Sequence, residues 1–360
     1  LLNFSKGISG STLNVVQNEF VKIVIGPEGF DQGRFSIETT GGDPSRENDD
    51  NLPLIYGRPK PWTSYTTIAI DNTNFGFGTQ TIKRAGKKAR YGQVVSKEIL
   101  DDGFKIDKKV VMYENEFNSP VGMTLATAKC MNGIAKALNE LKPDIMLITV
   151  DRVETLAAAS AASLMNYPIA HIQGGEVTGT IDESIRHAVT KMSHIHFPAT
   201  KDAYERILYM GEPKENIFLV GCPYIDIISK LKPTKKKDLT SKYQINFDKP
   251  VIIFTQHPVT TEFGQSKKQI EITVKALERF QDKVNIVNFY SNPDAGGEEI
   301  TKFLNSRSFL NIPNMDSHDF LSLMHHASLM IGNSSAGIRE APSFKLPVIN
   351  IGTRQNGRLR

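Results

Sequence analysis

The clearest chemical signal in the sequence is an apolar run followed by small polar residues, LMIGNSSAGIREAPSF at 329–344. The pattern predicts a strand that ends near Gly332 and a helix that begins shortly after Asn333. The free N–H groups and the dipole at a helix start favour an anion. The junction therefore predicts a phosphate site.

Individual residues of this run suit a nucleotide. Ser334 and Ser335 would add hydroxyl donors, Gly337 would let the backbone approach the ligand closely, and Glu340 could accept hydrogen bonds from a ribose. A capped helix without a ligand is the alternative. The sequence contains neither a GxxxxGK[ST] loop nor a complete GxGxxG motif, so the two best-known phosphate-binding loops are excluded.

Two predicted strands are each followed by a carboxylate. Asp151 comes directly after the apolar run 144–150, and Glu176 comes after the next apolar run and the pair Gly174-Gly175. Ligands of open α/β sheets lie beyond the carboxyl ends of the strands, so we expect both carboxylates at one edge. Paired glycines at a strand end also favour a backbone that lies close to a ligand.

A predicted helix that Asp182 could cap carries further ionisable residues. Glu183, Arg186 and His187 follow within it, and Glu183 and His187 are four residues apart, on one helix face. Carboxylates beside an arginine and a histidine suit proton transfer. The alternative is a surface helix with an ordinary ion pair.

A histidine marks the end of another predicted strand, in the segment FTQHPVT at 254–260. Pro258 stops the strand and leaves His257 at its end, where an imidazole could act as acid or base or bind phosphate. A hydrogen-bonded turn histidine is the alternative. HEXXH is absent and Cys130 and Cys222 lack zinc spacing, so we expect no metal and no cofactor.

The elements that position these residues change character along the chain. Residues 1–100 show short alternating runs at 21–25, 34–40 and 66–78 between turn clusters, which predicts antiparallel β structure. From residue 102 strands alternate with helices, which predicts a parallel sheet. A polar, lysine-rich segment at 228–249 is interpreted as a linker, after which a second α/β series follows.

Composition excludes several classes of protein. The chain of 360 residues has 39% hydrophobic and 23% charged residues, which fits globular domains and excludes a disordered chain or a disulfide miniprotein. No apolar run is long enough for a membrane helix. The net charge of +4 is mild and spread, so neither a nucleic acid nor a membrane is an expected partner. We expect a cytoplasmic protein that begins and ends as a fragment.

Taken together, these segments resemble the hydrolysing branch of the UDP-N-acetylglucosamine 2-epimerase family, which feeds sialic and nonulosonic acid synthesis. The resemblance runs from about residue 102 to the end. It rests on five segments of the sequence: KPDIMLITVDRVE, HIQGGEVTGTIDESIRHAVTKMSHIHF, VGCPYID, QHPVT and GNSSAGIREAPSFKLPVINIGTRQNGR.

The resemblance implies a fold and a reaction. The fold would be two Rossmann-like domains that face each other across a cleft, as in GT-B glycosyltransferases, with the nucleotide between them. The reaction would remove UDP and the C2 proton from UDP-N-acetylglucosamine or a UDP-diacetamido sugar to give a glycal. Water would then add to give the free 2-epimer, of the N-acetylmannosamine type.

The resemblance also assigns residues. Asp151, Glu176 and Glu183 match its acidic catalytic positions and His257 its cleft histidine. Substrate-binding positions would be Arg186, His187, Asn333, Ser334, Ser335, Gly337, Glu340 and Arg358, of which the last lies in the closing GTRQNGR segment. A UDP-sugar is the expected small-molecule partner, and a homo-oligomer is expected.

The sequence departs from the family at two places. Position 150 is Val where the family usually has Gly. Residues 1–100 do not match the family, so we expect a β-rich module of unknown role, an incomplete first domain at 102–228 and a nucleotide-binding domain at 245–360. A UDP-sugar-binding protein without activity, or a glycosyltransferase, are the alternative functions.

Overall fold

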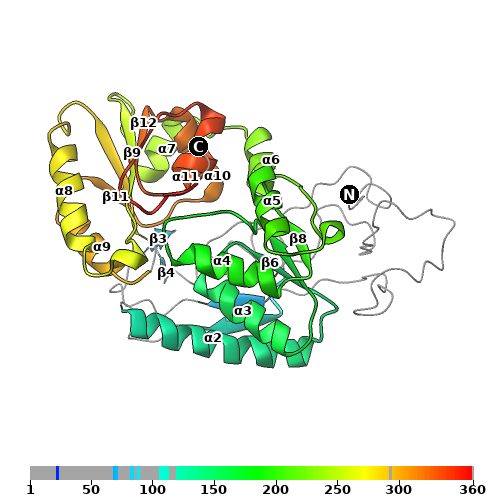
Figure 1. Ribbon diagram of the computed structural model, residues 1–360. Coiled ribbons are helices and arrows are strands. Elements are labelled where there is room, and N and C mark those ends of the chain that lie inside the picture. Colours follow the sequence, from blue (N-terminus) through cyan, green and yellow to red (C-terminus); the bar gives the residue numbers. More distant parts are fainter. Residues whose placement is uncertain are drawn as a thin grey trace.

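The computed structural model describes residues 105–112, 119–291 and 294–358, together with the backbone of four short strands before residue 90. These residues form two α/β lobes that lie against each other, one from the cyan and green part of the chain and one from the yellow to red part (Figure 1). The expected pair of α/β domains is thus present.

The first lobe contains a parallel sheet in the order β6-β7-β8. Its elements are β5 (Lys108–Val111), α2 (Pro120–Leu141), β6 (Met146–Thr149), α3 (Val153–Leu164), β7 (Ile169–Ile172), α4 (Ile181–Met192), β8 (Ile195–Phe197), α5 (Lys201–Tyr209) and the 3-10 helix η1 (Lys214–Asn216). After η1, Ile217 forms an isolated parallel bridge with His196 of β8.

Small side chains explain how the helices of this lobe pack. Five buried alanines of α3, at positions 157, 158, 159, 161 and 162, let the neighbouring helices α2 and α4 approach it from two sides. Helix α2 begins after Ser119, whose side chain accepts a hydrogen bond from Gly122 N, and ends at Leu141, with Lys142 as its left-handed C-cap. The apolar core beneath β6 follows from these contacts.

The second lobe contains a five-stranded parallel sheet in the order β11-β10-β9-β12-β13. Its elements are β9 (Val251–Thr255), η2 (Thr260–Glu262), α8 (Ser266–Glu278), β10 (Asn285–Phe289), α9 (Gly297–Asn305), β11 (Leu310–Ile312), α10 (Ser317–His326), β12 (Leu329–Gly332), α11 (Ala336–Arg339), η3 (Ala341–Phe344) and β13 (Val348–Asn350).

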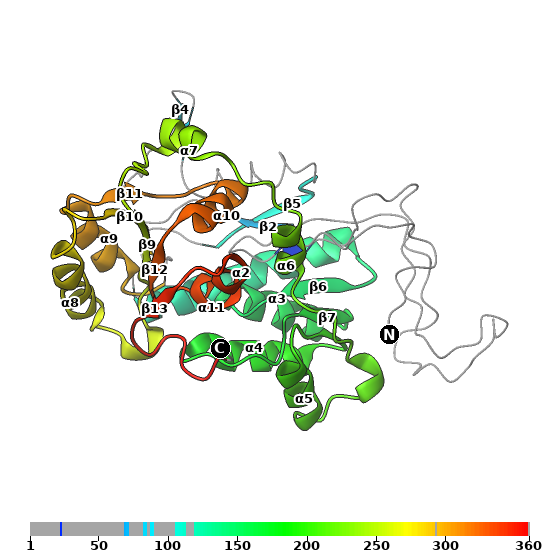
Figure 2. The same ribbon diagram turned by 90° about the horizontal axis from the view of Figure 1, so that it is seen from above.

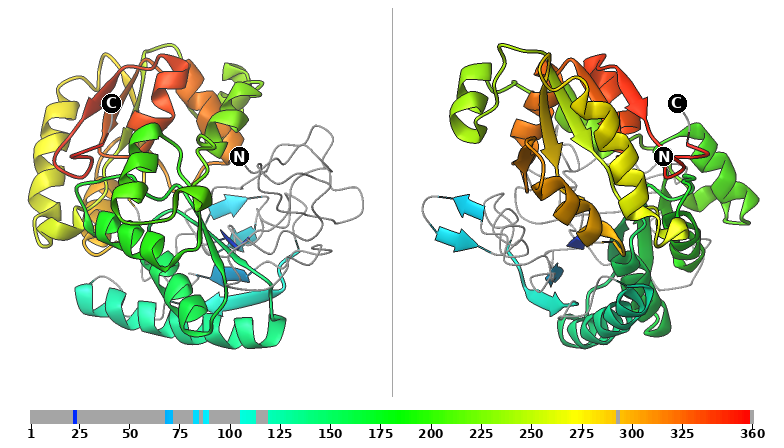
Figure 3. Two further views of the ribbon diagram at one scale, coloured as in Figure 1. Left: turned by 45° about the vertical axis from the view of Figure 1, so that its right-hand side comes forward. Right: turned by 90° about the vertical axis from the view of Figure 1, so that its left-hand side faces the viewer.

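The alternation of side chains on β9 divides this lobe into two cores. Ile252 and Phe254 pack against α8 and α9, whereas Val251 and Ile253 pack on the side of α10. Figure 3 shows helices of this lobe on both sides of its strands. The chain runs from β9 outward to β10 and β11 and then returns to the other side of β9 with β12. The carboxyl ends of β9 and β12 thus form a topological switch point, the usual ligand position of such sheets.

The segment 228–249 differs from the expected linker. It follows helix α6 (Pro223–Ser229) and contains helix α7 (Lys236–Tyr243). Ile228 and Ile245 are buried in the core of the second lobe. Asp319 of α10 accepts hydrogen bonds from Thr234 Oγ1 at 2.8 Å and from Tyr243 Oη at 2.7 Å. Apolar residues between the lysines therefore anchor this segment to the second lobe.

The described strands of the first hundred residues are β1 (Lys22–Ile23), β2 (Ile68–Asp71), β3 (Ile82–Arg84) and β4 (Lys87–Ala89). β1 and β2 pair antiparallel, as do β3 and β4, but β2 pairs in parallel with β5, and β1 lies beside β6. β1 and β2 thus adjoin the first lobe rather than a separate module. The expected strand at 34–40 lies outside the described residues. No described helix combines the length and apolar character needed to span a bilayer.

Val150 occupies a backbone conformation that favours glycine. Its φ is 72°, its N–H donates to Ile172 O at 3.2 Å, and its carbonyl oxygen lies 2.8 Å from His171 Nε2. Left-handed backbone is strained for a β-branched residue. These two contacts hold the turn that places Asp151, so the strain persists in the folded state.

Replacing Val150 by Gly should stabilise the protein. Relief of strain contributes roughly 1–3 kcal/mol, and the extra backbone entropy of glycine offsets about 0.5–1 kcal/mol. We expect a net gain of about 1 kcal/mol in the free energy of unfolding, measured by urea denaturation. Val220→Gly, at a residue outside the left-handed region, is the control and should lower stability. An equal decrease in the free energy of unfolding of both variants would contradict backbone strain at Val150.

Candidate active site

The ends of β9 and β12 are joined through His257 and Asn333. His257 N donates to Asn333 Oδ1 at 2.7 Å, and Asn333 Nδ2 donates to His257 O at 2.8 Å. Gly332 has a φ of 140°, and a Cβ atom there would lie 1.8 Å from Thr255 O. Because its amide binds the His257 backbone on both sides, Asn333 positions the histidine.

His257 is buried at this switch point. Burial lowers the pKa of its imidazole well below the ordinary value, and the nearby charges of Arg354 and Arg152 lower it further. The ring is therefore neutral at neutral pH. A neutral imidazole can accept or donate a proton, but it does not supply a positive charge to a phosphate.

The start of α11, where the sequence predicts an anion site, is a short helix. α11 has four residues, because the chain passes into the separate 3-10 helix η3, whose second residue is Pro342, so its dipole is small. Ser334 Oγ accepts a hydrogen bond from Ala336 N at 3.3 Å. A Cβ on Gly337 would lie 2.8 Å from Val348 Cγ1, so this glycine admits the neighbouring strand rather than a ligand. Ser334 and Ser335 are half-buried.

Glu340 follows α11 as a buried carboxylate. It is 8% exposed, and its Oε2 has no hydrogen-bond partner among the described residues. Burial raises the pKa of this carboxyl, against the opposing effect of Arg339. A buried acceptor of this kind suits a hydroxyl donor, as the sequence predicts for a ribose.

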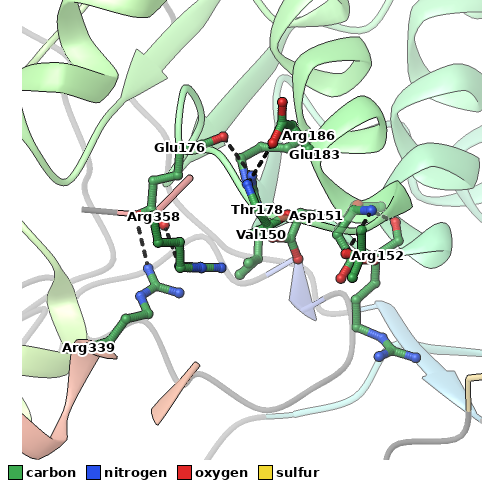
Figure 4. Close-up of polar contacts among 12 residues, drawn as sticks. Val150, Asp151, Arg152, Glu176, Thr178, Glu183, Arg186, Arg339 and Arg358 are labelled. Carbon is green, nitrogen blue, oxygen red and sulfur yellow. Dashed lines mark hydrogen bonds and ion pairs between the residues drawn. The ribbon is translucent and has the colours of Figure 1, made fainter. Parts of the chain in front are cut away.

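Asp151 and Arg186 form a buried ion pair at the edge of the first sheet (Figure 4). Arg186 is 1% exposed, and its other terminal nitrogen donates to Glu176 O at 2.6 Å. Burial alone would raise the pKa of Asp151, but Arg186 holds it below the usual value. Arg186 thus fixes Asp151 and the Glu176 backbone, and the substrate contact expected for it stays a prediction.

Glu176 and Glu183 have separate partners in the folded chain (Figure 4). Glu176 accepts from Arg339 at 3.2 Å and from Arg358 at 2.9 Å, both from the second lobe. Glu183 Oε2 accepts from Thr178 N at 2.7 Å and so stabilises the turn before α4. The structure thus shows a structural contact of Glu183, and its expected catalytic role stays a prediction.

Asp182 is a functional candidate that the sequence interpretation treated only as a cap. The cap of α4 is Thr180, whose side chain accepts from Asp182 N at 3.4 Å. Burial raises the pKa of the Asp182 carboxyl to about 6, with Asp151 and Asp294 adding to the effect and Arg354 opposing it. The only sequence signal was the adjacent acidic pair at a helix start.

The two lobes meet around these residues. Arg152 Nη2 lies 3.2 Å from Asp294, and Arg354 Nη2 lies 3.9 Å from Asp182. Gly179 N donates to Arg354 O at 3.0 Å, so the closing segment of the chain lies against the start of α4 (Figure 2). The site is therefore built from both lobes, and Arg152, Arg339 and Arg354 are members that the motifs did not single out.

Several buried polar atoms at this boundary have no hydrogen-bond partner among the described residues. They are Gln173 Oε1, Thr178 Oγ1, His187 Nδ1, Gln256 Oε1, Glu340 Oε2, Arg354 Nε, Gln355 Oε1 and Arg358 Nε. Buried polar groups are normally paired, so these atoms are available to water or to a polar ligand. Within the described part of the chain, no group of three side chains could hold a metal ion.

Comparison with known proteins gives consistent matches. A family profile of UDP-N-acetylglucosamine 2-epimerase matches residues 73–360. This match begins before residue 102, where the segments that resemble the family begin. A hydrolysing GDP/UDP-N,N'-diacetylbacillosamine 2-epimerase of Campylobacter jejuni is 37% identical over 72% of this chain and 69% of its own. A UDP-N-acetylglucosamine 2-epimerase of Neisseria meningitidis is 35% identical over 74% and 70%.

Solved structures show the same architecture. A Neisseria meningitidis UDP-GlcNAc 2-epimerase bound to UDP-GlcNAc superposes with a TM-score of 0.61 at 22% identity, over 74% of this chain and 73% of its own. The S. aureus protein MnaA, solved with UDP, gives a TM-score of 0.60 at 20% identity, over 80% and 79%. The GT-B-like pair of Rossmann-like domains is thus confirmed.

Proposed function

Because the chain belongs to the UDP-N-acetylglucosamine 2-epimerase family, we propose that it is a hydrolysing 2-epimerase of a UDP-activated 2-acetamido sugar. The substrate is UDP-N-acetylglucosamine or a UDP-diacetamido sugar, and the products are UDP and the free 2-epimer. The names of two similar proteins, the hydrolysing enzymes of Campylobacter jejuni and Legionella pneumophila, support the diacetamido sugar.

One observation carries the proposal: Arg354 connects two candidate acid–base groups. Its Nη2 lies 3.9 Å from Asp182, and its Nη1 donates to the backbone oxygen of Asn333, whose amide holds the His257 backbone. Arg186 keeps the pKa of Asp151 low, burial raises the pKa of Asp182 to about 6, and burial keeps His257 neutral. Neighbouring groups whose pKa values are pushed apart supply an acid and a base at the same pH. A 2-epimerase needs both.

The reaction has two proton-transfer steps. In the first, a base takes the C2 proton, the C2–H electrons form the C1–C2 double bond, and the C1–O bond electrons leave with UDP. In the second, water adds its oxygen to C1 while C2 receives a proton on the opposite face. Asp182 and His257 are our candidates for these transfers.

The nucleotide side of the site lies on the second lobe. Glu340 would accept hydrogen bonds from the ribose, and Ser334 and Ser335 would donate to the diphosphate. Asp151 and Arg186 support the site from the first lobe. Homo-oligomerisation and a cytoplasmic location stay predictions from the sequence.

The test of this function is a product assay. Purified protein is incubated with UDP-N-acetylglucosamine and, separately, with a UDP-diacetamido sugar, and both UDP and the free sugar are followed by NMR. We expect equimolar UDP and the C2-inverted free sugar from one of these substrates. A UDP-linked epimer, or no UDP release from either substrate, would contradict the proposal.

Replacing Ser335 by Glu should weaken UDP binding. The new carboxylate removes a hydroxyl donor and repels the diphosphate, a loss of roughly 1–3 kcal/mol or about tenfold or more in affinity. Calorimetry with UDP measures the change. Ser343→Glu, at an exposed residue after α11, adds the same charge as a control and should bind UDP like the wild type. Equal affinities for all three proteins would exclude Ser335 from the diphosphate site.

A further inference from the structure

Two arginines of the second lobe share one carboxylate of the first lobe. Arg339 Nη2 lies 3.2 Å from Glu176 Oε1, and Arg358 Nη1 lies 2.9 Å from Glu176 Oε2. The side chains of all three are at most 14% exposed. Burial lowers the pKa of Arg358 to about 10, with Arg339 adding to the effect. Two buried cations so close together require an anion between them.

The backbone around Glu176 is fixed independently of that carboxylate. Arg186 donates to Glu176 O at 2.6 Å, and Arg206 donates to Gly175 O at 2.6 Å. Gly175 has a φ of 78°, and a Cβ there would lie 2.3 Å from Ala203 O. The Glu176 side chain can therefore move while its main chain stays in place.

The arginines are also placed for a second anion. Arg339 belongs to the same short helix that follows Ser334 and Ser335. Arg358 Nε is buried and has no hydrogen-bond partner among the described residues, so this guanidinium has a donor to spare. Guanidinium groups bind phosphate and carboxylate oxygens with the same geometry.

We propose that Arg339 and Arg358 bind the diphosphate of the substrate, and that Glu176 occupies them as an internal competitor when no diphosphate is bound. This inference rests on the proposed function. Arrival of the diphosphate displaces the Glu176 carboxylate into the site as the sugar enters. Departure of UDP lets Glu176 return to the arginines and so favours product release.

The test is a comparison of ligand affinities in the full chain. Glu176→Gln keeps the shape of the side chain and removes its charge, so the arginines lose their competitor. Calorimetry should show that UDP and inorganic pyrophosphate bind Glu176→Gln about tenfold or more tightly than the wild type. Uridine, which lacks phosphates, should bind both proteins equally. Unchanged or weaker binding of UDP and pyrophosphate by the variant would overturn the proposal.

Two further variants complete the test. Glu262→Gln alters another carboxylate at the boundary, which pairs with Thr353, and should leave the affinity for pyrophosphate unchanged. Arg358→Gln should weaken UDP and pyrophosphate binding about tenfold, and wild-type affinity in this variant would also overturn the proposal. If Glu176→Gln is less stable, the rise in its melting temperature on adding UDP should still exceed that of the wild type. These binding results are separate from the product assay, so failure of the proposed function is recognised independently.

Discussion

Replacing Asp182 by Asn should lower the rate of UDP release by about 100-fold or more, the scale expected for loss of a positioned acid or base. Asn keeps the size of the side chain and cannot exchange a proton. The reason lies in the surroundings of Asp182, where burial and the nearby carboxylates Asp151 and Asp294 raise its pKa to about 6. A carboxyl of this kind exchanges protons near neutral pH.

The neighbouring residue provides the matched control. Glu183→Gln removes the same charge one position along α4, and Gln can still accept the hydrogen bond from Thr178 N. We expect its rate of UDP release to stay within about threefold of the wild type, because its carboxylate contacts the turn rather than the reacting groups. Equal losses in the two variants would remove the catalytic assignment of Asp182.

The pKa of Asp182 also predicts a stability effect. A carboxyl whose pKa rises from 3.8 to about 6 on folding favours the folded state while it is protonated. That contribution is complete below pH 3.8 and is lost as the pH rises through about 6. The free energy of unfolding of Asp182→Asn, relative to that of the wild type, should therefore rise by about 2–3 kcal/mol between pH 3.8 and a pH above 6, measured by urea denaturation at each pH.

Much of the fold could be predicted because strand and helix periods are local properties of the sequence. The expected strand before Asp151 is β6, and the expected strand that ends near Gly332 is β12. The sequence does not show that the 228–249 segment packs on the second lobe, because its lysines hide apolar anchors such as Leu239, which is fully buried. Charge in a short amphipathic helix says little about which residues its other face buries.

The site was predictable in its residues but less so in their roles. The sequence brings Asp151, Glu176 and His257 to strand ends, because ligands of α/β sheets lie there. It does not say which of Asp182 and Glu183 turns inward, since both begin the same helix. It also does not show that Glu176 meets Arg339 and Arg358, because those contacts join residues more than 160 positions apart.

Arg186→Gln should have the largest effect on stability, because it leaves the Asp151 carboxylate buried without its cation. Removing one partner of a buried ion pair costs roughly 3–5 kcal/mol. Arg186 is 1% exposed and also donates to Glu176 O at 2.6 Å, so its loss further frees the loop that carries Glu176. In urea denaturation, Arg186→Gln should therefore unfold at a lower midpoint concentration than the wild type, both in the absence and in the presence of UDP.

A second substitution separates the two effects of Arg186. In Asp151→Asn/Arg186→Gln both charges are absent, and we expect the double variant to be more stable than Arg186→Gln alone, because no unpaired charge stays buried. Lys201→Gln removes a cation from an exposed pair with Glu205 and should change stability by less than about 1 kcal/mol. If Arg186→Gln lowered the free energy of unfolding no more than this control, another group would have to stabilise the buried charge of Asp151. Arg186 would then be free for the substrate contact that the sequence suggested.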